Sequence, residues 1–481
     1  MPTEQKQLRR LTIAFVHPNL GIGGAERLVV DAAVSLQKRG HRVVVYTMHH
    51  DINHCFEETR DGTLDVRVGG GWLVPRSIFG RLHIACTTLR GLALARQVAN
   101  DNEQFDVVFV DQLAATIPLL RFTRARIFFY CHFPDYLQAR HDGLWRRIYR
   151  MPFDLLEQAT TGEADEVAVN SRFTQEVFRQ AFPLLSRVPR VLLPPLNLAA
   201  YDRPVDVDDA ALVGLRTHKR AILSINRFER RKDIGLAVDA VAQCIRERSD
   251  VCLFVAGGWD RDEPENIACL RELVAQADAL GLRTLTVAPV GLRADARAQL
   301  LPPNTISAPL VVTAGSNVDA EDLADVDVVF VPSFSDNQRA HLLTQATCVV
   351  YTPSNEHLGI VPLEAMYMRV PVVAVDSGGP RETVTVVHGK TGFLCEPTAD
   401  AFAEAIGAVL DMDEARRTAM GEAGRERVAK AHDLQSFGEQ LERLLAGTLE
   451  REPNAPMVLG VLLTLFILCT SVTIYMLASV V

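Results

Sequence analysis

Residues 11–47 read LTIAFVHPNLGIGGAERLVVDAAVSLQKRGHRVVVYT, and this stretch decides the fold of the first half of the chain. The apolar run at 11–16 predicts a buried strand, and apolar residues spaced three and four apart over 25–39 predict a helix. A second apolar run at 41–47 predicts another strand. A strand, a helix and a strand in this order form a βαβ unit, which belongs to a parallel sheet.

The same alternation continues to about residue 375. Further apolar runs predict strands at 107–110, 127–130, 166–169, 221–225, 251–256, 326–331, 348–351 and 370–375. Five prolines between residues 183 and 204 mark a hinge. We therefore predict an α/β protein with two doubly wound, Rossmann-like domains at 1–195 and 196–400, followed by closing helices at 401–450. In such sheets ligands bind at the carboxyl ends of the strands, so the site is expected in a cleft between the domains.

The composition is that of a folded protein. Of the 481 residues, 48% are apolar and 23% are charged, which excludes a disordered chain. The net charge of −9 argues against a general nucleic-acid binder, because phosphate contacts need a basic face. Nine scattered cysteines without a Cys-x-x-Cys pair indicate reduced thiols rather than a disulfide framework or a zinc site.

The end of the chain has the pattern of a membrane span. Residues 457–481 contain no charged side chain, and at about 1.5 Å per residue a helix there would reach about 37 Å. Arg443 and Arg451 precede this segment and no basic residue follows it, which predicts that residues 1–450 lie on the cytosolic side of a membrane. The alternative for this segment is a buried core helix. The apolar run at 11–16 is too short for a secretory signal.

Two carboxylates in PSNEHLGIVPLEAM, residues 353–366, point to chemistry. Gly359 permits a bend and Pro362 suits the start of a helix, so Glu356 is expected on the loop and Glu364 on the first turn. Free N–H groups at the start of a helix bind anions, and carboxylates accept hydrogen bonds from sugar hydroxyls. Together they predict a nucleotide-sugar site. The alternative is two solvated surface glutamates.

Glu-x7-Glu after a strand resembles the motif of the retaining family 4 glycosyltransferases, which have the GT-B fold. The resemblance implies that Glu356 contacts the donor sugar and Glu364 the ribose. It also implies that Arg227 and Lys232, in NRFERRKD (226–233), bind the donor diphosphate and neutralise the charge of the leaving group. The alternative for NRFERRKD is a solvated basic run.

Glycine-rich turns are candidate phosphate sites. Gly23 and Gly24 end the first strand and open a helix, where backbone N–H groups favour an anion. A nicotinamide site is excluded, because Glu26 stands where the dinucleotide fingerprint needs a third glycine. A tight turn without a ligand is the alternative. The predicted donor contacts are therefore Gly23, Gly24, Arg227, Lys232, Gly359, Ile360 and Glu364.

The first domain contributes an acceptor side. His132 lies in YCHFPD (130–135) directly after a predicted strand, and the resemblance implies a histidine near the transferred sugar. His132 would orient hydroxyls or assist proton flow, unless it is a core histidine. Asp135 is a candidate acceptor contact. In LWRRIYRMPF (144–153) basic and aromatic residues alternate, which suits a membrane surface or an anionic acceptor, although a solvated helix face is the alternative. The residues assigned to this acceptor and membrane side are Asp135, Trp145, Arg146, Arg147 and Arg150.

In combination, these segments resemble the eukaryotic α-1,3/1,6-mannosyltransferase family of dolichol-linked oligosaccharide synthesis. The resemblance implies GDP-mannose as donor, without a cofactor or a metal, and a dolichyl-diphosphate-linked Man1GlcNAc2 acceptor. It implies addition of α-1,3 and α-1,6 mannoses to the N-glycan precursor at the endoplasmic reticulum membrane. The bilayer and other mannosyltransferases of the same pathway are the further partners implied.

Two other readings keep most of these features. A GT-B transferase acting on another lipid, such as phosphatidylinositol, would need the same donor motifs. A non-catalytic, membrane-anchored scaffold would keep the fold without the activity. The presence of all four predicted donor residues, Arg227, Lys232, Glu356 and Glu364, disfavours the scaffold.

Overall fold

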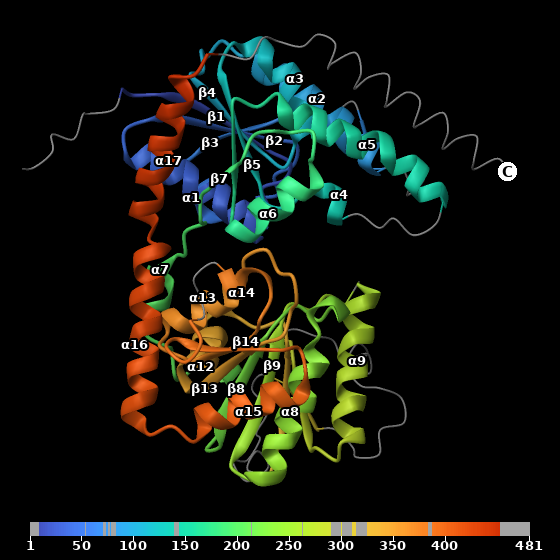
Figure 1. Cartoon of the computed structure of the whole chain (residues 1–481), viewed down its shortest axis with the longest axis vertical. Helices are drawn as coiled ribbons and strands as arrows, with labels where there is room; N and C mark the ends of the chain where they lie inside the picture. Colours follow the sequence, from blue (N-terminus) through green and yellow to red (C-terminus); the bar gives the residue numbers. More distant parts are fainter. Residues whose placement is uncertain are drawn as a thin grey trace, which may run out of the picture. The chain divides into compact units, whose positions relative to one another are not determined.

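The structure is a computed structural model that describes residues 9–452 except 53, 71–73, 76, 78–82, 139–143, 213, 262, 290–299, 301–309, 314–324 and 383–386. Its contacts divide the chain into two units (Figure 1). Unit 1 comprises Met1–Pro195 and Leu434–Val481, and unit 2 comprises Leu196–Asp433. The first division falls in the proline-rich segment. The helices expected to close the chain as one group are divided between the two units.

Unit 1 is built on a parallel sheet with the strand order β3-β2-β1-β4-β5-β6-β7. Its strands are β1 (Thr12–His17), β2 (Arg42–Thr47), β3 (Asp65–Val68), β4 (Val107–Asp111), β5 (Arg126–Cys131), β6 (Glu166–Val169) and β7 (Arg190–Val191). Its helices are α1 (Gly24–Lys38), α2 (His83–Ala99), α3 (Ile117–Leu120), α4 (Asp135–Gln138), α5 (Leu144–Gly162), α6 (Arg172–Ala181) and α17 (Leu434–Leu449).

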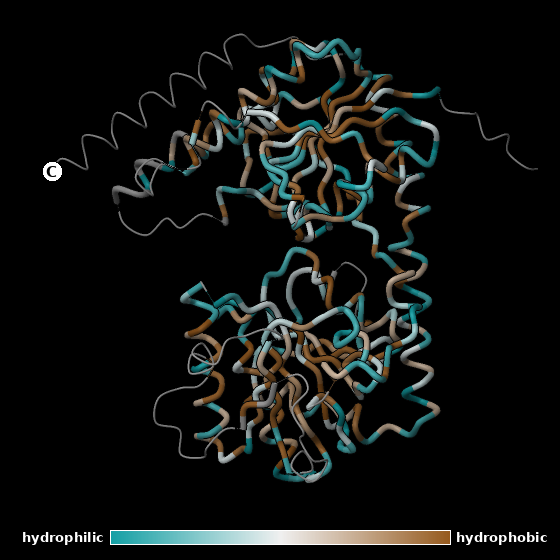
Figure 2. The backbone as a smooth tube through the Cα atoms, turned by 180° about the vertical axis from the view of Figure 1, so that it is seen from behind, coloured by the Kyte–Doolittle hydropathy of each residue, from teal (hydrophilic) through white to brown (hydrophobic). Residues whose placement is uncertain are grey.

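Helices cover both faces of this sheet. One face packs against α1 and α17 and the other against α2, α3 and α6, so the strands are buried on both sides (Figures 1 and 2). Buried polar contacts fix α17 in place. Glu442 of α17 accepts a hydrogen bond of 2.8 Å from Arg39 and lies 2.9 Å from the ring of His41. The last described helix is therefore part of the first unit.

Unit 2 has a second parallel sheet, with the order β11-β10-β12-β9-β8-β13-β14-β15. Its strands are β8 (Arg220–Ile225), β9 (Val251–Gly257), β10 (Thr284–Ala288), β11 (Leu310–Thr313), β12 (Val328–Pro332), β13 (Ala346–Tyr351), β14 (Val372–Val375) and β15 (Gly392–Cys395). Its helices are α7 (Leu198–Tyr201), α8 (Ile234–Glu247), α9 (Pro264–Ala279), α12 (Asp336–Gln345), α13 (Ile360–Tyr367), α14 (Gly378–Glu382), α15 (Ala399–Leu410) and α16 (Glu414–Ala431).

Two expectations of the sequence concern the whole chain. The eight cysteines that the structure describes are all unpaired and buried, as the scattered pattern predicts. Among the described residues, no helix has both the length and the apolar character needed to cross a bilayer. The predicted span at 457–481 lies outside these residues and remains a prediction.

Candidate active site

The site predicted in unit 2 lies at the carboxyl ends of four neighbouring strands, β9, β8, β13 and β14. The chain runs from β8 to β9 on one side and later returns to β13 on the other side. The strand order therefore reverses between β8 and β13, and the loops after these two strands diverge. Such a reversal leaves a crevice, which is the usual ligand site of a doubly wound sheet. Lys232 follows β8 and Glu356 follows β13.

Lys232 and Glu356 form an ion pair at this reversal. The sequence motifs assign both residues to the donor site, and the structure brings these two together. Their side chains are only 13% and 16% exposed. Both backbones are also anchored. The Thr352 hydroxyl donates to the carbonyl of Lys232 at 2.8 Å, and the N–H of Gly379 donates to the carbonyl of Glu356 at 2.6 Å. A partly buried charge pair held in this way is pre-positioned for a ligand.

The backbone around this pair is unusual. Asp233, Asn355, Gly359 and Gly378 all have positive φ, at 48°, 57°, 77° and 61°. For Asp233 and Asn355 this conformation costs free energy, and such strain is concentrated at functional sites. Gly378 has a further reason to be glycine, because a Cβ atom there would lie 2.4 Å from the carbonyl oxygen of Glu356.

Replacing Gly378 with alanine tests this local geometry. We expect transfer activity to fall at least tenfold, because the clash with backbone displaces Glu356 from Lys232. Gly281→Ala is the matched control. Gly281 also has a positive φ, of 75°, but a Cβ atom there meets nothing within 4 Å. Steady-state transfer rates and thermal unfolding are measured for both variants. An equal loss of activity in both would contradict a specific role for the Gly378 turn.

Two further cations lie beside the pair. Glu229 accepts hydrogen bonds from Arg231 at 2.6 Å and from Arg227 at 3.3 Å. Although burial opposes it, this contact with Arg231 lowers the pKa of Glu229. The side chain of Arg227 is 65% exposed and passes over Gly258 at the end of β9. Arg227 therefore lies next to the turn that follows β9, and Arg231 is a neighbouring cation that the sequence reading left out.

Glu364 is buried, with only 2% of its surface exposed. One carboxylate oxygen accepts a hydrogen bond of 2.6 Å from the Tyr201 hydroxyl and lies 3.1 Å from Arg339. The second oxygen is buried without a hydrogen-bond partner in the described part of the chain. Burial raises the pKa of Tyr351 well above its ordinary value, and the nearby charges of Glu356 and Glu364 add to this effect. Both glutamates are thus close to the same tyrosine.

The helix that carries Glu364 starts earlier than predicted. The first residue of α13 is Ile360, so Pro362 occupies the third helical position instead of the first. Proline is tolerated there because the first four N–H groups of a helix have no helical partner. Gly359 forms the N-cap and is buried, whereas Ile360 is 41% exposed, so of these two predicted donor contacts only Ile360 is open to solvent.

In unit 1, His132 belongs to a buried network. It follows β5, whereas His17 ends β1 and Asp111 ends β4, and these three strands are neighbours. The Nδ1 atom of His17 lies 2.7 Å from one oxygen of Asp111, and Nε2 of His132 lies 2.8 Å from the other. The His132 side chain is 17% exposed, while the other two are fully buried. Asp111 therefore fixes the ring of the histidine that reaches the surface.

The charges of this network support one another. Burial alone would lower the pKa of His17, but the hydrogen bond with Asp111 raises it to about 9. Against the opposing effect of burial, the charge of His132 lowers the pKa of Asp111, and His17 acts in the same direction. At neutral pH the carboxylate of Asp111 is therefore ionised and faces a protonated His17.

The glycine turn after β1 contains a carboxylate of its own. Gly23 is the N-cap of α1 and Gly24 is its first residue. A Cβ atom on Gly23 would lie 2.3 Å from an oxygen of Glu26, whose carboxylate also lies 3.8 Å from His17. A phosphate at this turn would have to approach a negative charge. The donor-binding role of Gly23 and Gly24 stays a prediction.

The residues predicted for the acceptor and membrane side do not all lie in one site. Asp135 and Arg150 line the same pocket in unit 1. Arg150 donates a hydrogen bond of 2.9 Å to Asp154, and Arg147 is exposed on the same helix. The side chains of Trp145 and Arg146 lie outside the described residues.

The described residues contain no group of three or more His, Cys, Asp or Glu side chains that could hold a metal ion.

Known proteins with the same fold define the class of this protein. The solved structure of sucrose-phosphate synthase from Thermosynechococcus elongatus matches with a TM-score of 0.64 at 20% identity, over 90% of this chain and 98% of that chain. Anabaena HepE in complex with UDP-glucose matches with a TM-score of 0.61 at 18% identity, over 91% and 100%. The Glycosyltransferase Family 4 model matches residues 22–199, and the model for Glycosyl transferases group 1 matches residues 319–427. The protein is a glycosyltransferase of GT-B fold.

Relatives of higher identity narrow the class. The α-1,3/1,6-mannosyltransferase ALG2 of Rhizomucor pusillus is 44% identical, over 93% of both chains. The human protein of the same name is 42% identical, over 92% of this chain and 97% of its own length. The chain belongs to the α-1,3/1,6-mannosyltransferase family.

Proposed function

We propose that this enzyme transfers mannose from GDP-mannose to a dolichyl-diphosphate-linked Man1GlcNAc2 acceptor and adds the α-1,3 and α-1,6 mannoses of the N-glycan precursor. The observation that carries the proposal is the ion pair between Lys232 and Glu356 at the strand reversal of unit 2. The names of the relatives support the sugar and both linkages. The donor nucleotide and the lipid are the parts that require direct measurement.

The donor half of the reaction follows from the charges in unit 2. As the sugar–phosphate bond breaks, negative charge develops on the diphosphate, and fixed cations stabilise it. Lys232 is held by Glu356, and Arg227 and Arg231 are held by Glu229. When the donor binds, mannose hydroxyls donate hydrogen bonds to Glu356, and a ribose hydroxyl donates to the free oxygen of Glu364.

The acceptor half is assigned to unit 1. In a retaining displacement on one face of the sugar, the acceptor hydroxyl attacks from the side that the diphosphate leaves, so no protein nucleophile is required. The proton of that hydroxyl passes to the departing phosphate. His132, held by Asp111, orients the hydroxyls around the reacting carbon.

The reaction as proposed uses the side chains of Lys232, Arg227 and Arg231 as the counter-charges of the diphosphate, and it therefore needs no bound metal. Transfer that is lost with EDTA and restored by Mg²⁺ would contradict this part of the proposal.

The proposal includes a transmembrane helix at 457–481, with the catalytic units on the cytosolic face of the endoplasmic reticulum. Deleting residues 453–481 is expected to release the protein from washed microsomes. The deleted segment begins after the end of α17, so the described part of unit 1 stays complete. Retention of the shortened chain on the membrane would mean that another surface holds it there.

The decisive experiment uses the purified full chain in detergent. It is incubated with GDP-mannose or UDP-N-acetylglucosamine, each with the lipid-diphosphate trisaccharide or with phosphatidylinositol. We expect two mannoses to be added only in the combination of GDP-mannose and the trisaccharide lipid, with α-1,3 and α-1,6 linkages by product analysis. If mannose were transferred to phosphatidylinositol and not to the trisaccharide lipid, the proposed acceptor would be wrong. If the protein bound neither nucleotide sugar, a non-catalytic scaffold would be indicated.

A further inference from the structure

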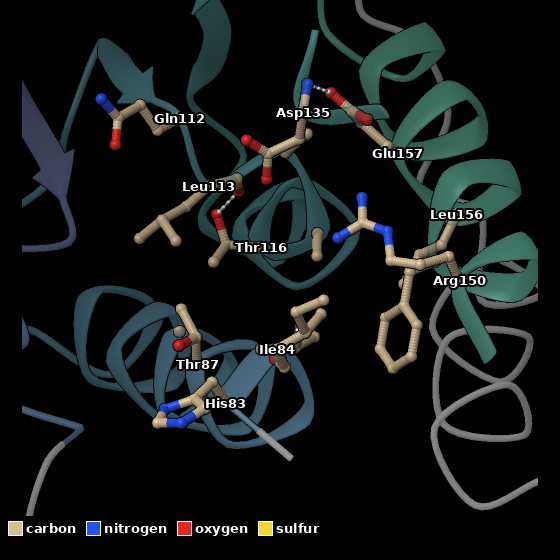
Figure 3. A pocket seen from close by; sticks show the side chains of 15 residues that line it. His83, Ile84, Thr87, Gln112, Leu113, Thr116, Asp135, Arg150, Leu156 and Glu157 are labelled. Carbon is tan, nitrogen blue, oxygen red and sulfur yellow. Dashed lines mark hydrogen bonds between the residues drawn. The ribbon is translucent and has the colours of Figure 1, made fainter. Parts of the chain in front are cut away.

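A pocket of about 290 Å³ lies within unit 1, apart from the strand-end network of His17, Asp111 and His132. It is bounded by α2, by the segment after β4, by Asp135 of α4 and by α5 (Figure 3). Ligand pockets generally begin at about 300 Å³. The space therefore suits one sugar ring or a group of similar size rather than a whole oligosaccharide.

One wall of the pocket is apolar. Ile84 of α2 and Phe153 and Leu156 of α5 contribute to it, and Phe153 packs in a small hydrophobic cluster with Ile84. An apolar wall next to polar groups matches the two sides of a pyranose, whose C–H face packs on hydrocarbon while its hydroxyls point sideways.

The charged part of the lining has more acidic than basic side chains. Asp135 and Glu157 are its two carboxylates, and Arg150 is its one guanidinium. That guanidinium already donates a hydrogen bond to Asp154. A phosphate or a diphosphate placed here would meet two lining carboxylates and one guanidinium that is already paired with Asp154, which disfavours an anionic ligand.

The two lining carboxylates have different tasks. The oxygens of Glu157 accept the backbone N–H groups of Asp135 and Tyr136, at 2.8 and 3.0 Å, so Glu157 fixes the start of α4. The carboxylate of Asp135 points toward the segment containing Leu113 and Thr116 (Figure 3). In the described part of the chain no group donates a hydrogen bond to it. Asp135 is thus an acceptor held in place by Glu157.

The surroundings of these two acids favour an uncharged ligand whose groups donate hydrogen bonds. Burial raises the pKa of Glu157 to about 7, and the charge of Asp135 adds to this effect. Asp135, by contrast, is exposed to solvent. A hydroxyl group can donate a hydrogen bond to its carboxylate without adding negative charge beside Glu157.

We propose that this pocket binds a neutral, hydroxyl-rich sugar unit of the lipid-linked acceptor, with Asp135 accepting its hydroxyl groups. The inference rests on the proposed function and makes it more specific. It assigns the sugar part of the acceptor to this pocket and excludes the diphosphate from it. Glu157 is a positioning residue for Asp135.

Asp135→Asn tests the assignment, because it keeps the shape of the side chain and removes its charge. Binding of the soluble trisaccharide Man1GlcNAc2, which carries no lipid, and of inorganic diphosphate is measured on the full chain by saturation-transfer NMR and calorimetry. We expect trisaccharide binding to weaken about tenfold, which is the loss expected for a hydrogen bond to a charged group. The KM for the lipid acceptor should rise similarly, while kcat and the affinity for GDP-mannose stay unchanged.

Glu57→Gln is the matched control. Glu57 is an exposed acid of unit 1 in the short 3-10 helix η1 (Glu57–Thr59), outside the pocket lining. Trisaccharide binding that is equal in Asp135→Asn, Glu57→Gln and the wild type would overturn the assignment, as would diphosphate binding that depends on Asp135. If the wild type bound the trisaccharide through Asp135 but transferred no mannose, the pocket would stand and the proposed function would fall.

Discussion

Replacing Glu356 with glutamine is expected to lower kcat for mannose transfer by at least 10²- to 10³-fold while the fold stays intact. Glu356 is the only group seen to pair with Lys232 among the described residues, and both side chains are mostly buried. The substitution keeps the shape but removes the charge that holds Lys232 and that accepts the sugar hydroxyls. Losses of this size follow the removal of one pre-positioned group that stabilises a transition state.

Glu272→Gln provides the control for this prediction. Glu272 also pairs with a cation of the segment after β8, Arg230, but both side chains are more than half exposed. An exposed pair of this kind contributes little, so neither activity nor thermal unfolding should change. Transfer rates are measured at saturating donor, with circular dichroism as the test of folding. Normal turnover by Glu356→Gln would remove the role assigned to the pair.

The largest expected effect on stability is that of Asp111→Ala. The carboxylate of Asp111 is fully buried between His17 and His132. Its removal leaves the buried imidazolium of His17 with only the more distant carboxylate of Glu26, at 3.8 Å, and breaking a buried pair in this way costs about 3–5 kcal/mol. We expect the unfolding transition of unit 1 to move to lower temperature by an amount that corresponds to this loss. Glu57→Ala, an exposed acid of the same unit, should leave it unchanged.

The effect of Asp111→Ala should depend on pH in a defined direction. The pKa of His17 is raised from 6.5 to about 9 in the folded protein. Its contribution to stability is therefore fully present below pH 6.5 and is lost as the pH rises through 9. The difference in unfolding temperature between the wild type and Asp111→Ala should be largest at pH 6.5 and smaller at pH 9.5. A difference that grows with pH would contradict a protonated His17.

Local patterns explain what the sequence could predict. The strand at Thr12–His17 and the helix after it have the periodicities of a buried strand and an amphipathic helix, and both are observed. The strand β3 lies at the edge of the sheet and was missed because its four residues, DVRV, contain only two apolar side chains, too few for the alternation to be recognised. Its Arg67 forms ion pairs with Asp65 and Asp101, and such contacts leave no trace of hydrophobic periodicity.

Only those residues of the candidate site that lie in a recognisable sequence motif could be predicted. Lys232 and Glu356 each lie in a segment with a recognisable pattern, and the strand order brings them together. Asp111 and Tyr201 were missed. Asp111 contacts a histidine 94 positions away, and Tyr201 contacts Glu364 over 163 positions. The one local signal for Asp111 is a polar residue directly after a buried strand, which alone does not identify a partner.

The return of α17 to unit 1 has a consequence for how the protein is made. Unit 2 is one uninterrupted stretch, Leu196–Asp433, whereas unit 1 needs the segment that follows it. On the ribosome the second half can fold as soon as it has emerged, but one face of the first sheet is covered only in part, by α1, until α17 leaves the exit tunnel. Recombinant expression of the first half alone, without Leu434–Leu449, would expose the hydrophobic surface that this helix protects.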